Sequence, residues 1–472
     1  MTRLSGRLIV FLVFTVSRLA ILASDQREST LTGVNVRYAF EAQRAASLGM
    51  SIYKLHAESR QLEDAAIPPV ERLVEYPPLT ILWMKVPTWF LDPIPKTGSA
   101  PDPWVRAAKW ANRIAMFVVD LCGFGILALI GATGAQLAVY TAGGLLLFPV
   151  LYDRFDLLLG VLLLGAMVLL LRKRPSWAPL TVLAVAINLK ITPLVLVPLF
   201  VLGTLPENAL SSPSGARPWG LIGRRLAMLS ALGAALFLPF FVKDGFSTLD
   251  FLRYHAMRGL EIGAVWNTIP IALSAIFQWP ASPSFRFGCV ELKSALGGPL
   301  RTMASAYMAA VIPVLAFLLW RLLIKLGIPA KVGGTATLAQ ANPALFLRCA
   351  VVCLLTAIVG AHVLSPQYLL WLVPLVVLWE GRWQRCVWAV FLAMCALTTL
   401  SYPFLWKVLI FVLQPHSRLP LWLRLLWSAP LIARNLLLVG FTAWLWIEMF
   451  RKPASGLAAV EQLNDPEMGR PF

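Results

Sequence analysis

Residues 156–203 read DLLLGVLLLGAMVLLLRKRPSWAPLTVLAVAINLKITPLVLVPLFVLG, and this stretch decides the fold class. Its apolar runs approach the length of about 20 residues that a helix needs to cross a hydrocarbon core of roughly 30 Å. Similar runs recur along all 472 residues, of which 58% are hydrophobic and 14% charged. A soluble domain has roughly 25% charged residues. The sequence therefore predicts an all-α polytopic membrane protein, with the bilayer as its solvent and no large soluble domain.

The net charge of +18 would indicate a nucleic-acid partner in a soluble protein. Here the basic residues flank apolar runs, so we interpret them as orientation signals and lipid-headgroup contacts, with no nucleic acid bound. The six cysteines form no CxxC pair, and the sequence has no HExxH motif, so it supports neither a metal site nor a cofactor. The clusters predicted to be cytoplasmic are Arg3 with Arg7, residues 96–113, residues 172–174, Arg224 with Arg225, residues 321–331, Arg382 with Arg385, and Arg451 with Lys452.

The N-terminal part predicts one span, a long loop and a second span. Residues 8–23 carry Arg18, and we interpret them as a retained first span rather than a signal peptide. Residues 25–75 contain eight of the 23 acidic residues and are expected to form the first extracytoplasmic loop. Residues 38–48 are a short amphipathic helix within it, and residues 79–91 are expected to form span two.

Residues 177–203 do not fit a simple alternation, because basic clusters lie on both sides of them. Lys190 stands at the centre of this run, and Pro193 follows it. An unpaired lysine at mid-membrane depth is costly, and proline removes a backbone donor. We predict a re-entrant hairpin of two half-helices, 178–190 and 191–203, with Lys190 facing a polar cavity. The alternative is one ordinary span with a snorkelling lysine.

The remaining segments are more regular. We expect residues 1–450 to form a single transmembrane domain of nine to thirteen membrane segments with both termini inside. Residues 243–300 form a second long extracytoplasmic loop, residues 404–428 suit an interfacial segment, and the polar tail 451–472 is expected to be disordered. The further predicted spans are 226–242, 302–323, 346–363, 367–379, 386–403 and 430–450.

Five polar groups interrupt the apolar pattern, and such positions are functional candidates in a membrane protein. Each also has a structural reading: a helix start, a capped loop, a snorkelling lysine, an interfacial helix or a turn with aromatic anchors. All five fall at the extracytoplasmic ends of the predicted spans. They are residues 75–78, residues 153–156, Lys190 with Pro193, residues 253–267 and residues 362–374.

In order along the chain, EYPP (75–78), RFD (154–156), KITP (190–193), RGLEI (258–262) and SPQYLLW (365–371) resemble glycosyltransferase family eighty-seven. This is a group of bacterial transferases that use polyprenyl-phosphate sugars, many of them mannosyltransferases, within the multi-span GT-C superfamily. The resemblance spans about residues 5–450. It implies a GT-C-like helical bundle in the inner membrane, with its active site facing the extracytoplasmic side.

The resemblance also implies a reaction. An acceptor hydroxyl on a glycolipid, glycan or protein attacks the anomeric carbon of a lipid-linked phosphosugar, and the lipid phosphate leaves. A carboxylate of the first loop acts as the base, while cationic side chains stabilise the phosphate. Mapped onto this chain, the phosphate binders are Lys190, Arg258, His255 and Arg154, and the sugar or lipid pocket comprises Asp156, Glu261, Gln367, Tyr368 and Trp371.

One position departs from the family pattern. The family carries an Asp shortly before a Tyr in its first loop, but the matching stretch GVNVRY (33–38) has Asn35 there. An amide cannot act as a general base, so Glu75 is our first substitute and Asp25 our second. The pair Gly263 and Ala264 likewise stands where the family has polar residues.

Two other functions are compatible with these residues. A transporter or flippase of a lipid-linked or polar solute also uses broken helices and a lysine within the membrane. A non-catalytic scaffold or sensor of the same family would explain Asn35. The one-sided placement of the polar groups favours the transferase.

Overall fold

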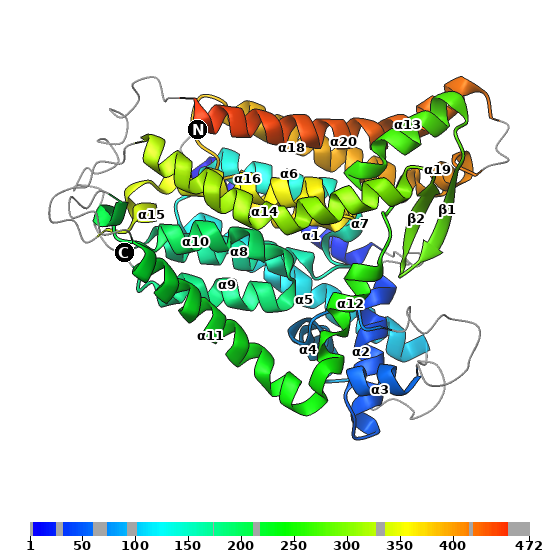
Figure 1. Cartoon of the computed structure of the whole chain (residues 1–472), viewed down its shortest axis with the longest axis horizontal. Coiled ribbons are helices and arrows are strands. Elements are labelled where there is room, and N and C mark those ends of the chain that lie inside the picture. The colour runs from blue at the N-terminus through cyan, green and yellow to red at the C-terminus, as the bar shows by residue number, and fades with distance from the viewer. Residues whose placement is uncertain are drawn as a thin grey trace.

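The computed structural model describes residues 3–24, 32–59, 73–91, 102–172, 174–210, 218–326, 336–414 and 419–451. Within these ranges the chain is almost wholly helical, and most helices of the bundle run along the horizontal direction of Figure 1. Seven segments of the described chain are long and apolar enough to cross a membrane. The prediction of a helical, polytopic membrane protein is therefore confirmed.

The seven long segments fall in α1 (Arg3–Ala23), α5 (Asp102–Leu129), α11 (Trp219–Asp244) continued by α12 (Asp250–Met257), α14 (Gly297–Leu326), α16 (Pro343–Gly360), α18 (Gln384–Thr399) continued to Phe404, and α20 (Leu421–Phe450). The shorter helices are α2 (Thr32–Ser47), α3 (Ile52–Ser59), α4 (Pro78–Lys85), α6 (Gly134–Leu146), α7 (Phe148–Leu151), α8 (Asp156–Leu171), α9 (Trp177–Leu189), α10 (Val197–Gly203), α13 (Thr268–Phe277), α15 (Leu338–Ala341), α17 (Val373–Val376) and α19 (Trp406–Val412). Strands β1 (Ala281–Arg286) and β2 (Cys289–Ser294) form an antiparallel hairpin beside α13.

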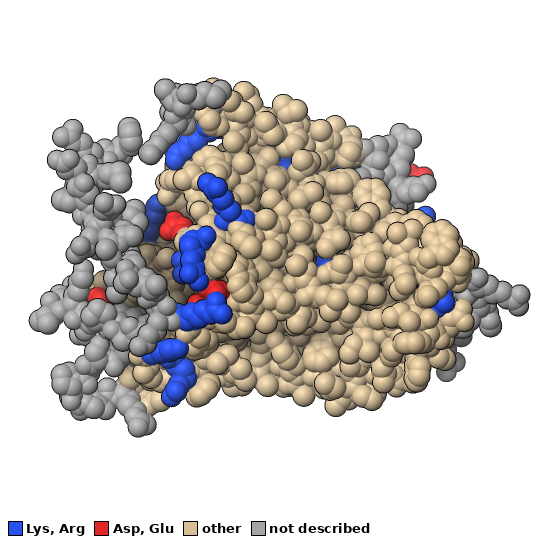
Figure 2. Space-filling view, turned by 90° about the horizontal axis from the view of Figure 1, so that it is seen from above, with Lys and Arg blue, Asp and Glu red and all other residues tan. Residues whose placement is uncertain are grey.

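The bundle has two chemically different ends. At one end Arg7 contacts the Gly131 carbonyl, Lys325 the Phe450 carbonyl and Arg382 the Glu448 carboxylate. We call this the basic end. Figure 2 shows Lys and Arg side chains gathered toward one end of the displayed face, beside a broad uncharged area. Helices α2, α3, α4 and α12 lie at the opposite end, which we call the cavity end (Figure 1).

Residues 177–203 form the predicted hairpin. Helix α9 ends at Leu189, Lys190 is extended at φ −155° and ψ 133°, and a 3₁₀ helix (Thr192–Leu196) leads into α10. The Thr80 hydroxyl donates to the carbonyl of Leu189, which satisfies part of the broken helix end.

The hairpin begins and ends at the basic end, and its turn lies at the cavity end. The Gln340 side chain donates to the Arg172 carbonyl at 2.7 Å, just before α9, and the Glu207 amide donates to the Ala336 carbonyl at 3.0 Å, just after α10. Residues before and after the hairpin therefore meet the same segment, 336–340. The single-span alternative is wrong.

The predicted second span is also wrong. Residues 79–91 fall in α4 and a 3₁₀ helix (Val86–Thr88), and eight helical residues extend only about 12 Å. Helix α4 instead packs against α2 and α9 at the cavity end. As a result α5 begins there too, and Arg113 donates to the Ser24 carbonyl, just after α1, at 2.8 Å. The described part of the basic cluster 96–113 thus lies opposite the basic end, contrary to our orientation prediction.

The two predicted loops contain regular structure. Helix α2 confirms the amphipathic helix at 38–48 and begins earlier, at Thr32. Residues 243–300 contain α12, α13 and the β-hairpin. The predicted interfacial segment 404–428 is wrong for residues 421–428. These residues belong to α20, which begins at Leu421 and continues as one long helix. The tail 452–472 lies outside the described residues.

A buried ion pair fixes α1 to the rest of the bundle. Arg18 Nε contacts Asp120 Oδ2 at 2.8 Å, and both side chains are almost fully buried. Tyr140 and Tyr152 donate to the two oxygens of the same carboxylate at 2.7 and 2.9 Å. Because every partner of this carboxylate is polar, the pair is stabilised despite its burial. This ion pair explains how the otherwise apolar helix α1 can carry the charged side chain of Arg18.

Gly160 allows α8 to approach the 3₁₀ helix Pro366–Trp371. A Cβ at Gly160 would stand 2.5 Å from the Leu370 carbonyl oxygen. We expect Gly160→Ala to destabilise the protein by about 1–3 kcal/mol through overpacking, measured by thermal unfolding in detergent. Gly165→Ala is the matched control on the same helix, since a Cβ there meets nothing within 4 Å. Equal unfolding temperatures for the two variants would contradict the close packing.

Candidate functional site

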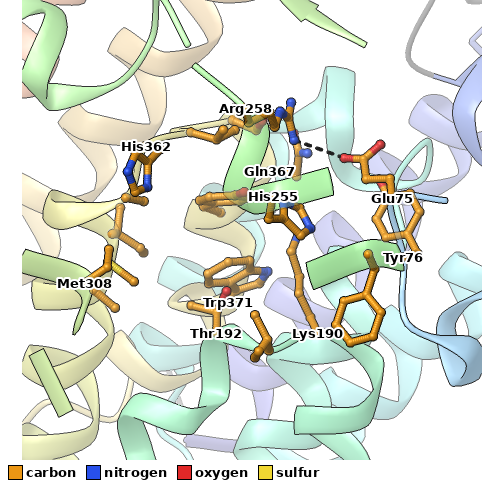
Figure 3. A pocket seen from close by; sticks show the side chains of 18 of the residues that line it. Glu75, Tyr76, Lys190, Thr192, His255, Arg258, Met308, His362, Gln367 and Trp371 are labelled. Atoms are coloured by element: carbon orange, nitrogen blue, oxygen red, sulfur yellow. Dashed lines mark hydrogen bonds and ion pairs between the residues drawn. The ribbon is translucent and has the colours of Figure 1, made fainter. Parts of the chain in front are cut away.

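A cavity of about 150 Å³ opens at the cavity end of the bundle, where four chain breaks meet. They are the extended stretch before α4, the break after α9, the turn after α12 and the turn after α16. Figure 3 shows polar side chains from all four pointing toward one space. The predicted residues that line the cavity are Glu75, Lys190, His255, Arg258, Gln367, Tyr368 and Trp371.

Lys190 is the cation at the floor of the cavity. Its Nζ contacts Asp156 Oδ1 at 2.7 Å, and the indole of Trp371 donates to the same oxygen at 2.8 Å. The ammonium also lies 4.6 Å from the ring centroid of Tyr368 and 4.8 Å from that of Trp371. Asp156 is buried behind Lys190 and does not line the cavity. Its carboxylate holds the ammonium in place, and the aromatic faces stabilise the charge.

Arg258 is the second cation, and it pairs with Glu75 across the cavity. Arg258 Nη1 lies 3.2 Å from Glu75 Oε1, the contact marked by the dashed line in Figure 3. Burial alone would lower the pKa of Arg258, but Glu75 and neighbouring groups raise it well above its usual value. The buried Nε of Arg258 has no hydrogen-bond partner in the described structure. An arginine with an unused N–H can donate a hydrogen bond to a further anionic oxygen.

The segment that carries Glu75 is held by two tyrosines. The Glu75 amide donates to the Tyr38 hydroxyl at 3.1 Å, and the Tyr53 hydroxyl donates to the Tyr76 carbonyl at 2.7 Å. Tyr38 comes from α2 and Tyr53 from α3. The first loop therefore contributes to the site by positioning Glu75.

Glu261 stands one layer behind the cavity rather than lining it. Its carboxylate accepts from the Ser365 hydroxyl at 3.4 Å, and its amide donates to the His362 carbonyl at 3.0 Å. Burial raises the pKa of Glu261, although Arg258 and Arg434 act in the opposite direction. We therefore correct its predicted pocket role to one of joining the turn after α12 to the turn after α16.

Asn35 and Arg154 do not line the cavity either. Asn35 is buried, and its Nδ2 donates to the Asp153 carbonyl at 3.4 Å while its Oδ1 has no partner among the described residues. Burial would lower the pKa of Arg154, but Tyr76, Glu75 and Asp156 raise it. Asp25 lies outside the described residues.

Sequence reasoning missed the far wall of the cavity. Met308 of α14 and Ala357 and Ile358 of α16 line it, beside His362, which belongs to the predicted group 362–374. The apolar members give no sequence signal, because they look like any residue of a spanning helix. His362 does give one, since it is a polar residue directly after an apolar run.

The described residues contain no group of three His, Cys, Asp or Glu side chains that could hold a metal ion. Fold and site together define a helical, multi-span membrane protein with a polar cavity at one end of its bundle. Neither a scan against models of protein families nor a search of curated proteins finds a match to this chain.

Proposed function

We propose that this protein is a membrane glycosyltransferase with a GT-C-like bundle, related to glycosyltransferase family eighty-seven. It would move a hexose, with mannose as first choice, from a polyprenyl-phosphate donor to an acceptor hydroxyl. One observation carries the proposal: Lys190 and Arg258 both line one cavity together with the carboxylate of Glu75 and the rings of Tyr368 and Trp371. Cations suit a phosphate, and flat apolar faces suit a sugar ring.

The arrangement supports a division of roles. Lys190, held by Asp156, and Arg258, with its unused Nε, would bind the donor phosphate and stabilise the charge that develops as it leaves. Tyr368 and Trp371 would pack against the sugar or the first prenyl unit. Gln367 Oε1 is buried without a partner in the described structure, so it can accept a hydrogen bond from a sugar hydroxyl. Glu75 orders Arg258 until the phosphate arrives.

The distribution of charge supports an orientation. Arg7, Lys325 and Arg382 lie at the end opposite the cavity, and positively charged loops usually stay in the cytoplasm. We therefore propose an inner-membrane location with the cavity facing the extracytoplasmic side, where a lipid-linked donor can enter laterally from the bilayer.

The experiment uses the purified full-length chain in lipid nanodiscs. It is incubated with polyprenyl-phosphate mannose or polyprenyl-phosphate glucose, with octyl mannoside as the acceptor. We expect glycosylated octyl mannoside and free polyprenyl phosphate, with one donor preferred. A flippase would instead move intact donor across proteoliposomes without cleaving the sugar–phosphate bond. Intact donors together with transbilayer movement would therefore overturn the proposal in favour of transport.

A further inference from the structure

The wall of the cavity away from Glu75 carries a histidine to which the sequence assigned no role. Figure 3 places His362 on the side opposite Glu75, with His255 and Trp371 between them. Its neighbours on this wall, Met308 and Ile358, are apolar. Among the described lining residues, His362 is the titratable side chain on this wall.

Ser305 of α14 contacts the ring of His362. His362 Nε2 lies 2.9 Å from the Ser305 hydroxyl oxygen, and this hydroxyl donates its one proton to the Arg301 carbonyl at 3.0 Å. When this hydroxyl donates to the Arg301 carbonyl, its oxygen accepts from Nε2–H of His362. A neutral imidazole has one donor nitrogen and one acceptor nitrogen. In this arrangement Nδ1 is the acceptor nitrogen.

The backbone that carries His362 is fixed on both sides. The Glu261 amide donates to the His362 carbonyl at 3.0 Å, and the Trp266 indole donates to the Gly360 carbonyl at 3.0 Å. Such support is what a group needs when it must receive a proton in a defined direction.

We propose that His362 is the general base of the transfer reaction and that Ser305 is its positioning residue. This inference rests on the proposed function. The acceptor hydroxyl gives its proton to Nδ1 while its oxygen bonds to the anomeric carbon. The bond from that carbon to the phosphate oxygen breaks, and its electron pair stays on the phosphate beside Lys190 and Arg258. The imidazolium then releases its proton to water.

Two observations favour His362 over Glu75. Glu75 already pairs with Arg258 at 3.2 Å, so its carboxylate is engaged by another side chain. Burial lowers the pKa of His362, and the charge of Arg301 on α14 acts in the same direction, against a hydrogen bond to the Arg301 backbone. The charged groups of the other cavity walls are Arg258, Lys190 and Glu75. His362 is therefore unprotonated, and able to act as a base, at neutral pH.

The test compares His362→Gln, His362→Ala and Ser305→Ala with the wild type in the nanodisc assay. We expect His362→Gln to lower kcat by about 10²–10⁴-fold with little change in KM for the donor. The wild-type rate should fall as pH drops through a pKa below the usual value of about 6.5, and this acidic limb should vanish in His362→Gln. Imidazole should partly rescue His362→Ala, and Ser305→Ala should show a smaller loss of kcat.

His56→Gln is the matched control, because His56 contacts Glu41 on another part of the chain and does not line the cavity. It should keep both the rate and the acidic limb. Binding of undecaprenyl phosphate should be the same in His362→Gln and wild type, which shows that the variant is folded. A His362→Gln protein that retains both rate and acidic limb overturns the inference but not the proposed function. A wild-type protein that transfers no sugar overturns both.

Discussion

Lys190→Ala is expected to lower the rate of sugar transfer by about two to three orders of magnitude. Lys190 is the ammonium at the cavity floor, held at 2.7 Å from Asp156. Without Lys190, no ammonium at this position stabilises the negative charge on the leaving phosphate. In the wild type, Asp156 already orients that ammonium before the reaction begins. The measurement is the initial rate of transfer from polyprenyl-phosphate mannose to octyl mannoside. Lys325→Ala at the basic end is the matched control and should retain the wild-type rate.

The same substitution also leaves a buried charge without its partner. Asp156 is 1% exposed, so removing Lys190 alone should destabilise the fold by about 3–5 kcal/mol. The double variant Lys190→Met with Asp156→Asn removes both charges and should recover most of this stability. If the double variant unfolds near the wild-type temperature and still transfers no sugar, the loss is chemical. Recovery of transfer along with stability would show that Lys190 has only a structural role.

Arg258→Ala is expected to weaken binding of undecaprenyl phosphate and to lower transfer by about 10²-fold. Arg258 is buried, and its Nε lacks a partner in the described structure, so it is prepared to bind an anionic oxygen. Arg258→Lys keeps the charge but loses the forked geometry and should recover only part of the activity. Binding is measured by titration in nanodiscs, and transfer is measured as for Lys190.

Glu75→Gln tests whether Arg258 needs its ion pair with Glu75 in order to bind phosphate. It removes the carboxylate that holds Arg258 at 3.2 Å and should leave undecaprenyl phosphate binding equal or tighter. Arg382→Ala, an exposed arginine at the basic end, is the control for a general loss of positive charge. Wild-type phosphate binding by Arg258→Ala would contradict the assigned role.

The class of protein and the hairpin could be predicted from the sequence because both depend on apolar length and on single breaks within it. Lys190 with Pro193 is such a break, and the structure places it at the turn of the hairpin. The second span could not be predicted correctly. Residues 79–91 are apolar because α4 packs against α2 and α9. A helix buried in protein and a helix buried in lipid can have the same apolar composition, so composition does not distinguish them.

The orientation rule failed at one cluster for a related reason. Arg113 of α5 lies near the end of α1 and the start of α8. It donates to the Ser24 carbonyl, and its Nε lies 3.7 Å from Asp153 Oδ1. A basic residue with internal partners carries no information about the side of the membrane. Counting charges cannot separate such residues from those that face lipid headgroups.

The site was predictable where polar residues interrupt apolar runs, and not where helices come together. Glu75, Lys190, Arg258 and Gln367 were identified individually, but nothing in the sequence pairs Glu75 with Arg258. Such pairings depend on tertiary contacts between segments far apart in the chain. The wall formed by α14 and α16 was missed for the same reason.

The hairpin also has a consequence for how the chain enters the membrane during synthesis. A translocon releases segments sideways according to their hydrophobicity, and a central lysine makes such release unfavourable. Asp156 is made before Lys190 and begins α8, on which α9 packs. We therefore expect the hairpin to leave the translocon together with α8, after the Lys190 ammonium and the Asp156 carboxylate have met. Residues 156–203 would then be inserted as one unit rather than as successive independent helices.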